Sequence, residues 1–288
     1  MNRDKCSPEF LAWFIGFFEA EGYYAPRNKK IVEDERHSTW NFDVDVSTEP
    51  NRITFEITKK DPKLMYKIRT ILGFGKVHCI TKKNGEVYYR YFTSKKENIL
   101  RLTALFNGNL ILSKRQRQFE KVISSINHMW KLNLKVKSWT MKPTLNNAWL
   151  TGFVEGDGAF YTNVTNSFIR GHYPDGKVRY GFFLKFYITQ DGETLILESI
   201  RDLFQATNKL SSFTSTNTSK QYFRLEITNI KSRKLILAYF NKFPFLSQKK
   251  IDFLRWERIH GYQQRGERLS EKSAKKLQQL ILELDEPV

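Results

Sequence analysis

The sequence predicts an α+β protein made of two pseudo-symmetric copies of one module. The first observation is that AWFIGFFEAEGYY at residues 12–24 is repeated as AWLTGFVEGDGAF at residues 148–160. The second is that segments alternating apolar and polar residues follow each copy, a period typical of strands buried on one face. Each copy therefore reads as a helix, a strand pair, a second helix, a second strand pair and one or two closing helices.

The matched segments keep the same order in both copies. The corresponding pairs are FEIT at 55–58 with FYIT at 186–189, IRTIL at 68–72 with IRDLF at 200–204, FTSKKEN at 92–98 with ITNIKSR at 227–233, and LFNGNLILSKRQ at 105–116 with YFNKFPFLSQKK at 239–250. A further strand, WNFDVDV at 40–46, is expected in the first copy. Two glycine-containing turns, KNGE at 83–86 and PDGK at 174–177, mark places where strands reverse.

Domain boundaries are expected where the periodicity fails. Residues 127–146 carry four lysines and one proline without a clear hydrophobic period, which is typical of a linker. We expect an N-terminal module at 1–126, this linker, a C-terminal module at 147–270 and a surface-lying helical tail at 271–288.

The composition favours a polyanionic partner. Forty-eight Lys and Arg against thirty Asp and Glu leave a net charge of +18 and a pI near 9.7, which points to nucleic acid first. An anionic membrane surface is the competing interpretation, but no run reaches the roughly 18 apolar residues that span a bilayer, and the first residues lack a signal peptide's apolar segment. Two cysteines are too few for a disulfide framework or a thiolate zinc site. We expect a soluble intracellular protein, and the abundance of Lys, Asn, Ile, Phe and Tyr points to an AT-rich, organellar genome.

The repeated segment is expected to be a buried helix. Ser7 can cap its start, Pro8 suits the first helical position, and Gly22 suits a left-handed residue at its end. Residues 12–18 are apolar on every side, so a second surface has to cover the helix. The other motif helix can do so.

Packing of the two motif helices would bring their acidic ends together. Gly16 and Gly152 would allow close approach, and Glu21 and Asp157 would become neighbours about a pseudo-twofold axis. Carboxylates at a helix C-terminus oppose the dipole by roughly 0.3 to 1 kcal/mol each, and two of them repel. A divalent cation reverses that penalty, and all-oxygen ligands suit Mg²⁺. The expected ligands are the carboxylates of Glu21 and Asp157 and the carbonyls of Ala20 and Gly156.

Two further acids recur, Glu19 and Glu155. One turn geometry cannot direct both acids of a motif at one metal cluster, so we expect these two to accept hydrogen bonds at a helix end.

FIGFFEAEG at 14–22 and LTGFVEGDG at 150–158 resemble the nine-residue motif of the LAGLIDADG homing endonucleases in their single-chain, two-motif form, and the resemblance covers about residues 8–255. It implies two four-stranded antiparallel sheets that form a DNA-binding saddle, packed through the paired motif helices. It also implies that Glu21 and Asp157 are the metal ligands, with Glu21 in place of the more usual Asp. Further active-site residues that it implies are Lys59 in place of an amide, Gln190, Lys96 and Lys231.

The resemblance implies a monomer that cuts a long pseudo-palindromic or asymmetric duplex DNA site, leaving short 3′ overhangs. Mg²⁺ would be the cofactor, Mn²⁺ would substitute, and Ca²⁺ would support binding without cleavage. Alternating residues on one strand face could read bases in the major groove. The candidates are Arg27, Lys29, Asn41, Asp43, Asp45, Asn163, Thr165 and Arg179.

Two alternatives stay open. Some members of the family act as RNA maturases that assist group I intron splicing, with intron RNA as the partner. A DNA-binding protein without activity is the other alternative, but it would be expected to have lost one acid. An intein is not expected, since no splicing nucleophile or His-Asn terminus flanks the chain. The expected compartment is an organelle, mitochondrion or chloroplast, with no membrane association.

Overall fold

The computed structural model describes residues 6–27, 52–163, 169–172, 174–176, 178–181, 183–214, 220–265 and 270–285. The chain divides into two compact units, Met1–Gly156 and Asp157–Val288. The sequence-based domain boundaries stay predictions, and each unit is described by itself.

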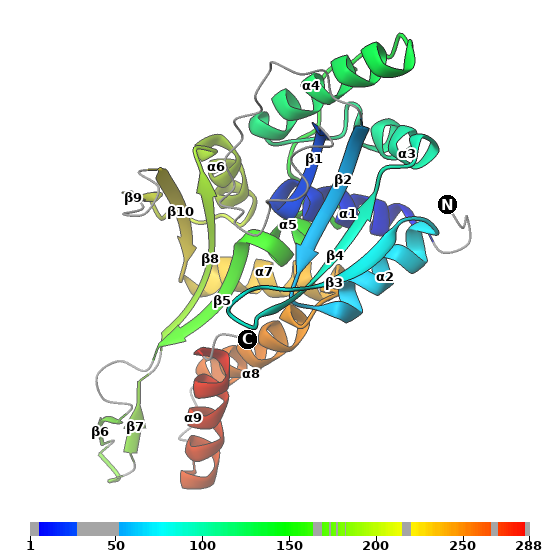
Figure 1. The fold of residues 1–288 in the computed structure, drawn as a ribbon. Helices are drawn as coiled ribbons and strands as arrows, with labels where there is room; N and C mark the ends of the chain where they lie inside the picture. Colours follow the sequence, from blue (N-terminus) through cyan, green and yellow to red (C-terminus); the bar gives the residue numbers. More distant parts are fainter. Residues whose placement is uncertain are drawn as a thin grey trace. The chain divides into compact units, whose positions relative to one another are not determined.

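The first unit is a four-stranded antiparallel sheet with helices packed on one face (Figure 1). The strands pair in the order β1-β2-β4-β3. The elements are α1 (Pro8–Glu21), β1 (Gly22–Arg27), β2 (Arg52–Lys59), α2 (Pro62–Leu72), β3 (Lys76–Thr81), β4 (Val87–Thr93), α3 (Lys96–Phe106), α4 (Ser113–Trp130) and α5 (Trp149–Asp157), of which only the last residue belongs to the second unit.

Alternation along β2 decides which face of this sheet is buried. Phe55 and Ile57 are at most 1% exposed, because every second side chain points toward the helices. Phe55 packs on Phe18 of α1 and Phe106 of α3, with ring centroids 5.3 and 5.7 Å apart. An aromatic core thus anchors α1 to the sheet.

The connection from α4 to α5 lies along the first unit. Asn107 and Asn127 each donate to and accept from backbone groups of residues 134–137, at distances of 2.8 to 2.9 Å. Trp139 donates to Glu120 at 3.1 Å. This part of the expected linker is therefore attached to the unit that precedes it.

The second unit repeats the architecture, with strand order β5-β8-β10-β9. A separate hairpin of β6 and β7 is inserted between β5 and β8 (Figure 1). The elements are β5 (Gly158–Asn163), β6 (Ile169–His172), β7 (Val178–Tyr180), β8 (Phe183–Asp191), α6 (Thr194–Leu203), β9 (Ser211–Thr214), β10 (Gln221–Ile227), α7 (Ile230–Lys242), α8 (Lys249–Arg265) and α9 (Glu271–Asp285). Within the described residues, no helix is both long enough and apolar enough to span a membrane.

The predicted fold class is confirmed, because both units have the expected helix and strand order and a four-stranded antiparallel sheet. The β6–β7 hairpin was not expected as a separate sheet. The expected strand at 40–46 lies outside the described residues.

The predicted conformation of Gly22 is wrong. Gly22 is extended, with φ −79° and ψ 153°, because α1 leads directly into β1 without a left-handed turn. A Cβ at this position would lie 2.0 Å from the Phe18 ring, so glycine is required by steric contact. The start of the helix is as expected, since Ser7 accepts a hydrogen bond from the Phe10 amide at 3.1 Å and Pro8 follows it.

Candidate active site

The two motif helices pack at backbone contact within the first unit. A Cβ built on Gly16 of α1 would lie 2.0 Å from the carbonyl oxygen of Trp149 in α5. A Cβ built on Gly152 of α5 would lie 1.8 Å from the carbonyl oxygen of Trp13 in α1. Such a reciprocal pattern is what a local twofold axis produces. The glycines permit a separation that no other residue would allow.

Glu19 connects three elements of the first unit. Its Oε1 accepts from the backbone amides of Ile111 and Leu112, both at 2.7 Å, at the start of α4. Its Oε2 accepts from the Trp149 indole N–H at 2.6 Å. The side chain is fully buried, and burial raises its pKa to about 7 although these donors lower it. Glu19 thus bonds at a helix end, and Glu155 is likewise buried at the same position of α5.

Glu21 ends α1 and is paired with Lys59, which ends β2. The Lys59 ammonium group donates to Oε1 of Glu21. A Cβ built on Gly156 of α5 would lie 2.8 Å from Cγ of Glu21 and 3.1 Å from its Oε1. Glycine at 156 therefore leaves space for the Glu21 side chain, and the next residue of the chain is Asp157.

Asp157 ends α5, and its Oδ2 accepts from the Gln190 amide nitrogen at 2.5 Å. Gln190 is 2% exposed and also donates to the Thr189 carbonyl at 2.9 Å. Lys59 and Gln190 each follow the threonine of the matched FEIT and FYIT strands. Each motif acid therefore receives a hydrogen bond from the equivalent position of its own sheet.

A second basic position, which the sequence analysis missed, approaches each motif. Arg115 donates to the Glu19 carbonyl at 2.8 Å and to the Ala20 carbonyl at 3.3 Å. In the second unit, the ammonium group of Lys249 donates to the Gly158 carbonyl. The two side chains hold equivalent positions, because the matched segments at 105–116 and 239–250 align Arg115 with Lys249. That alignment was the signal that could have identified them.

The two lysines expected from the resemblance do not occupy equivalent positions. Lys96 begins α3, is exposed, and lies with Nζ 5.5 Å from the Trp130 ring centre. Lys231 is the second residue of α7, which begins at Ile230 and not at a lysine. The expected pairing is therefore off by one position, because the connections that precede the two helices have the same length. A catalytic role for either lysine stays a prediction.

Both halves of the chain match one sequence family. The sequence model of the family described as "LAGLIDADG endonuclease" matches residues 14–126 and 150–260. The chain belongs to the LAGLIDADG endonuclease family. The expected resemblance is thus confirmed for both copies of the motif.

Relatives and solved structures of the LAGLIDADG family resemble the chain over most of its length. "Probable intron-encoded endonuclease 4" of Neurospora crassa is 27% identical over 259 residues, which are 87% of this chain and 40% of that protein. "Intron-encoded RNA maturase bI4" of Saccharomyces cerevisiae is 30% identical over 149 residues, 52% of this chain and 19% of that protein. The crystal structure of the I-LtrWI LAGLIDADG homing endonuclease bound to target DNA has a TM-score of 0.66 at 19% identity, covering 96% of this chain and 98% of that one. The chain spans less than half the length of these two curated relatives.

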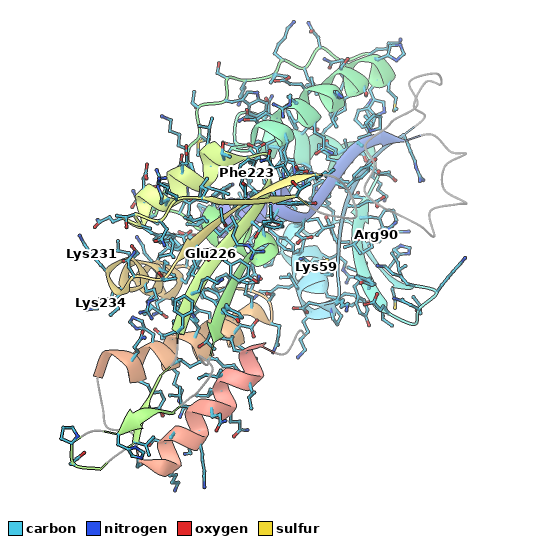
Figure 2. All side chains as sticks on the ribbon, turned by 90° about the vertical axis from the view of Figure 1, so that its left-hand side faces the viewer. Lys59, Arg90, Phe223, Glu226, Lys231 and Lys234 are labelled. Carbon is cyan, nitrogen blue, oxygen red and sulfur yellow. The ribbon has the colours of Figure 1, made fainter. Side chains whose placement is uncertain are left out.

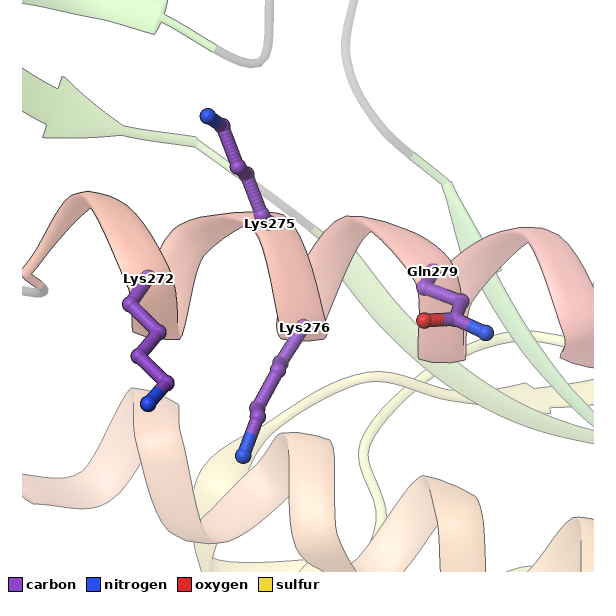
Figure 3. A pocket seen from close by; sticks show the side chains of 4 residues that line it. All are labelled: Lys272, Lys275, Lys276 and Gln279. Carbon is purple, nitrogen blue, oxygen red and sulfur yellow. The ribbon is translucent and has the colours of Figure 1, made fainter.

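A metal cluster and the α9 pocket are the other places in the described residues where a catalytic site could lie. Within the described ranges, no three His, Cys, Asp or Glu side chains are grouped so as to hold a metal ion. A pocket of about 440 Å³ opens on α9 and is lined by Lys272, Lys275, Lys276 and Gln279 (Figure 3). These side chains supply ammonium and amide groups but no carboxylate, so the LAGLIDADG motifs remain the candidate active site.

None of the eight predicted DNA-reading side chains is described by the structure. Arg27 lies in β1, Asn163 in β5 and Arg179 in β7, but only their backbone is described. The remaining predicted readers, which lie outside the described residues, are Lys29, Asn41, Asp43, Asp45 and Thr165.

The sheet face away from the helices carries an arginine that the sequence analysis did not select. In the first unit, Arg90 of β4 donates to the Thr58 hydroxyl at 3.3 Å and lies 3.4 Å from Glu56 (Figure 2). In the second, Arg224 of β10 donates to the Thr189 hydroxyl at 2.9 Å. The sequence signal that could have identified these two arginines is that VYYRYFT of β4 and QYFRLEI of β10 both carry an arginine at the fourth position.

The outer face of each sheet carries a glutamate, but the two glutamates lie on strands that do not correspond to each other. Glu56 of β2 lies opposite Phe92 of β4, whereas Tyr187 of β8 lies opposite Glu226 of β10. Lys185 bonds Glu226 at 2.8 Å. The two outer faces therefore present different side chains at matched positions.

Proposed function

We propose that the chain is a site-specific homing endonuclease that makes a double-strand cut in a long duplex DNA target, leaving short 3′ overhangs. The observation that carries the proposal is that both motifs of this LAGLIDADG family member end in an acid. Each acid, Glu21 and Asp157, also receives a hydrogen bond from the equivalent strand position. A binding protein without activity would have no need of both.

Glu21 and Asp157 are the proposed ligands of divalent metal ions, with Mg²⁺ the working cofactor. Among the described residues Lys59 is the hydrogen-bonding partner of Glu21, through Oε1, which leaves Oε2 for a cation. Carboxylates at helix C-termini favour a cation because they oppose the helix dipole. The Ala20 carbonyl is a poorer candidate than expected, since it already accepts from Arg115. Bound metal would lower the pKa of an attacking water and stabilise the leaving 3′ oxygen.

The surrounding side chains position these groups. Lys59 and Gln190 each donate to one carboxylate oxygen and so fix its orientation, and Lys59 has further N–H donors for a phosphate oxygen. Arg115 and Lys249 add positive charge where the scissile phosphates would approach. Lys96 and Lys231 are kept as candidate catalytic residues, as the family resemblance implies.

The outer faces of the two sheets are the proposed DNA-contacting surfaces. With a net charge of +18, affinity is expected to fall steeply as salt rises, because phosphate contacts release counterions. We propose a monomer encoded in an intron of an organellar genome, in line with the similarity to an intron-encoded endonuclease of Neurospora crassa and with the composition.

Selection from a randomised duplex library, with Mg²⁺ and separately with Ca²⁺, would yield the target. On that target, Glu21→Gln and Asp157→Asn should each abolish cutting in Mg²⁺ and retain binding in Ca²⁺. Asp202→Asn, at an exposed acid of α6, is the matched control and should cut like the wild type. Cutting at the wild-type rate by the double variant would overturn the metal assignment.

A maturase is the second candidate function, favoured by the 30% identity to the yeast maturase. Its test is splicing of the precursor RNA that contains the chain's own reading frame. Splicing that persists in Glu21→Gln, together with no duplex cutting by the wild type, would favour this function over the endonuclease.

A further inference from the structure

Five polar side chains of α7 and α8 in the second unit have unpaired atoms, and three of them lie together, because Trp256 stacks on His260 with ring centroids 6.2 Å apart and Arg233 lies close enough to His260 to repel its charged form. Their unpaired atoms are Ser232 Oγ, Arg233 Nε and Nη1, Trp256 Nε1, His260 Nε2 and Gln263 Oε1, none of which has a hydrogen-bond partner within the part of the chain that the structure describes. Arg233 is only 2% exposed and His260 only 5%. Buried polar groups are normally paired, so a cluster of unpaired ones needs an explanation.

The first copy has apolar side chains at four of these five positions, and the fifth, Ser232, corresponds to the buried Asn98. Thr93 and Ile227 end matched strands 134 positions apart, and the same offset relates the helices that follow. The equivalents of Arg233, Trp256, His260 and Gln263 are Ile99, Val122, Ile126 and Met129. The first three of these are fully buried. The second copy has therefore exchanged an ordinary apolar core for one that holds an unpaired guanidinium, which is strongly unfavourable unless a partner binds.

The charge around the cluster is positive. Lys231, Arg233 and Lys234 lie near the N-terminus of α7, where the helix dipole already disfavours cations, and α7 contains no acidic residue. Lys231 and Lys234 extend from the exposed side of α7 (Figure 2). Burial lowers the pKa of Arg233 to about 10. The pKa of His260 is lowered to about 4, by burial and by repulsion from Arg233 and Lys234.

We propose that the N-terminal part of α7 and the facing side of α8 form a binding site for a phosphate group. Arg233, Ser232 and Trp256 supply N–H and O–H donors, and neutral His260 can add one more. A planar guanidinium beside several donors matches a tetrahedral oxyanion, which has more acceptor oxygens than a carboxylate. A helix N-terminus favours the same negative charge. The phosphate is either free or part of a nucleic-acid backbone.

This site is separate from the proposed DNA-contacting face. Phe240 of α7 packs on Phe160 and Phe186, with ring centroids 5.7 and 5.8 Å apart, and Trp256 of α8 packs on Phe160 at 5.3 Å. The two helices therefore cover the inner face of the second sheet, opposite the face that carries Lys185. The site thus adds a contact to the chain that does not depend on the proposed cleavage.

Thermal unfolding of the whole chain in potassium phosphate and in potassium chloride, at equal ionic strength and pH 7.5, tests the site. Phosphate should raise the wild-type Tm by about 3 to 6 °C relative to chloride. Such a shift is typical of a ligand whose concentration is far above its Kd. Arg233→Met should lose this rise, as should the double variant Arg233→Ile and His260→Ile, which restores the apolar residues of the first copy. Ile99→Met, at the matched position, should keep it.

An equal rise in Tm in the wild type and in Arg233→Met would overturn the proposal. The absence of a rise in the wild-type Tm would also overturn it, without the use of any variant. Binding of a labelled 20-nucleotide RNA and of a duplex without the target distinguishes the two sources. A several-fold weaker affinity of Arg233→Met for either would support a phosphodiester as the ligand. Unchanged affinity together with a lost phosphate rise would support free phosphate.

Discussion

Replacing Gly16 by alanine tests how closely the two motif helices pack. The added Cβ would lie 2.0 Å from the Trp149 carbonyl oxygen and 2.9 Å from the Phe153 amide nitrogen. Because carbon and oxygen atoms in close contact are about 3.3 Å apart, α1 and α5 would have to separate by about 1.3 Å. Overpacking of a buried interface costs about 1 to 3 kcal/mol, and here the obstacle is backbone, which yields little.

The helix propensity of alanine acts in the opposite direction, because it would stabilise the helix. The sign of the change in the free energy of unfolding therefore shows which of the two contributions is larger. Alanine is favoured over glycine inside a helix by about 1 kcal/mol. Gly261 of α8 is the matched control, since a Cβ there would meet nothing within 4 Å. We expect Gly261→Ala to stabilise the chain by about 0.5 to 1 kcal/mol and Gly16→Ala to destabilise it by about 1 to 3 kcal/mol.

Urea unfolding followed by tryptophan fluorescence measures both variants, because Trp13 and Trp149 lie at this interface. The transition that reports these tryptophans should move to lower urea for Gly16→Ala and not for Gly261→Ala. A midpoint for Gly16→Ala equal to or above that of the wild type would refute the close packing of α1 and α5.

Three further predictions concern buried polar groups. Trp149→Phe removes the indole donor from Glu19 Oε2 and should destabilise the chain by about 2 kcal/mol in urea unfolding, because a buried acceptor loses its partner. Tyr24→Phe removes the hydroxyl that lies 2.6 Å from the Thr103 hydroxyl and should cost about 1 kcal/mol in the same assay. The pKa of His260 is about 4 in the folded chain against roughly 6.5 unfolded, so the unfolded state binds more protons between these values and stability should fall by on the order of 3 kcal/mol from pH 6.5 to 4.

The first two of these predictions have matched control variants. Trp139→Phe removes an indole donor from an exposed glutamate and should change stability little, as should Tyr66→Phe. For the third prediction, His260→Ile should flatten the pH dependence of stability between pH 6.5 and 4. Equal effects of a buried variant and its control would contradict the burial and bonding described for that group.

The repeat was readable from the sequence because its signals are local. Apolar spacing of two in the strands, an apolar helix and an acid before glycine recur within short windows at matched positions, so both sheets and both motif ends could be predicted. Lys59 and Gln190 were identified from the family resemblance, which implies a polar active-site residue directly after each matched strand. Their contacts with Glu21 and Asp157 then follow from strand order.

The sequence by itself determined the duplicated architecture, the basic charge and the two acidic helix ends. Only the tertiary structure decided that Glu19 bonds the start of α4 and that Arg115 approaches the first motif. It also decided that Arg233 is buried, with Nε and Nη1 unpaired among the described residues. The Glu19 contact joins residues 93 positions apart in the chain. Hydrophobic periodicity specifies which face of an element is buried, but the partner of a buried polar atom depends on which distant backbone or side chain the packed elements place against it.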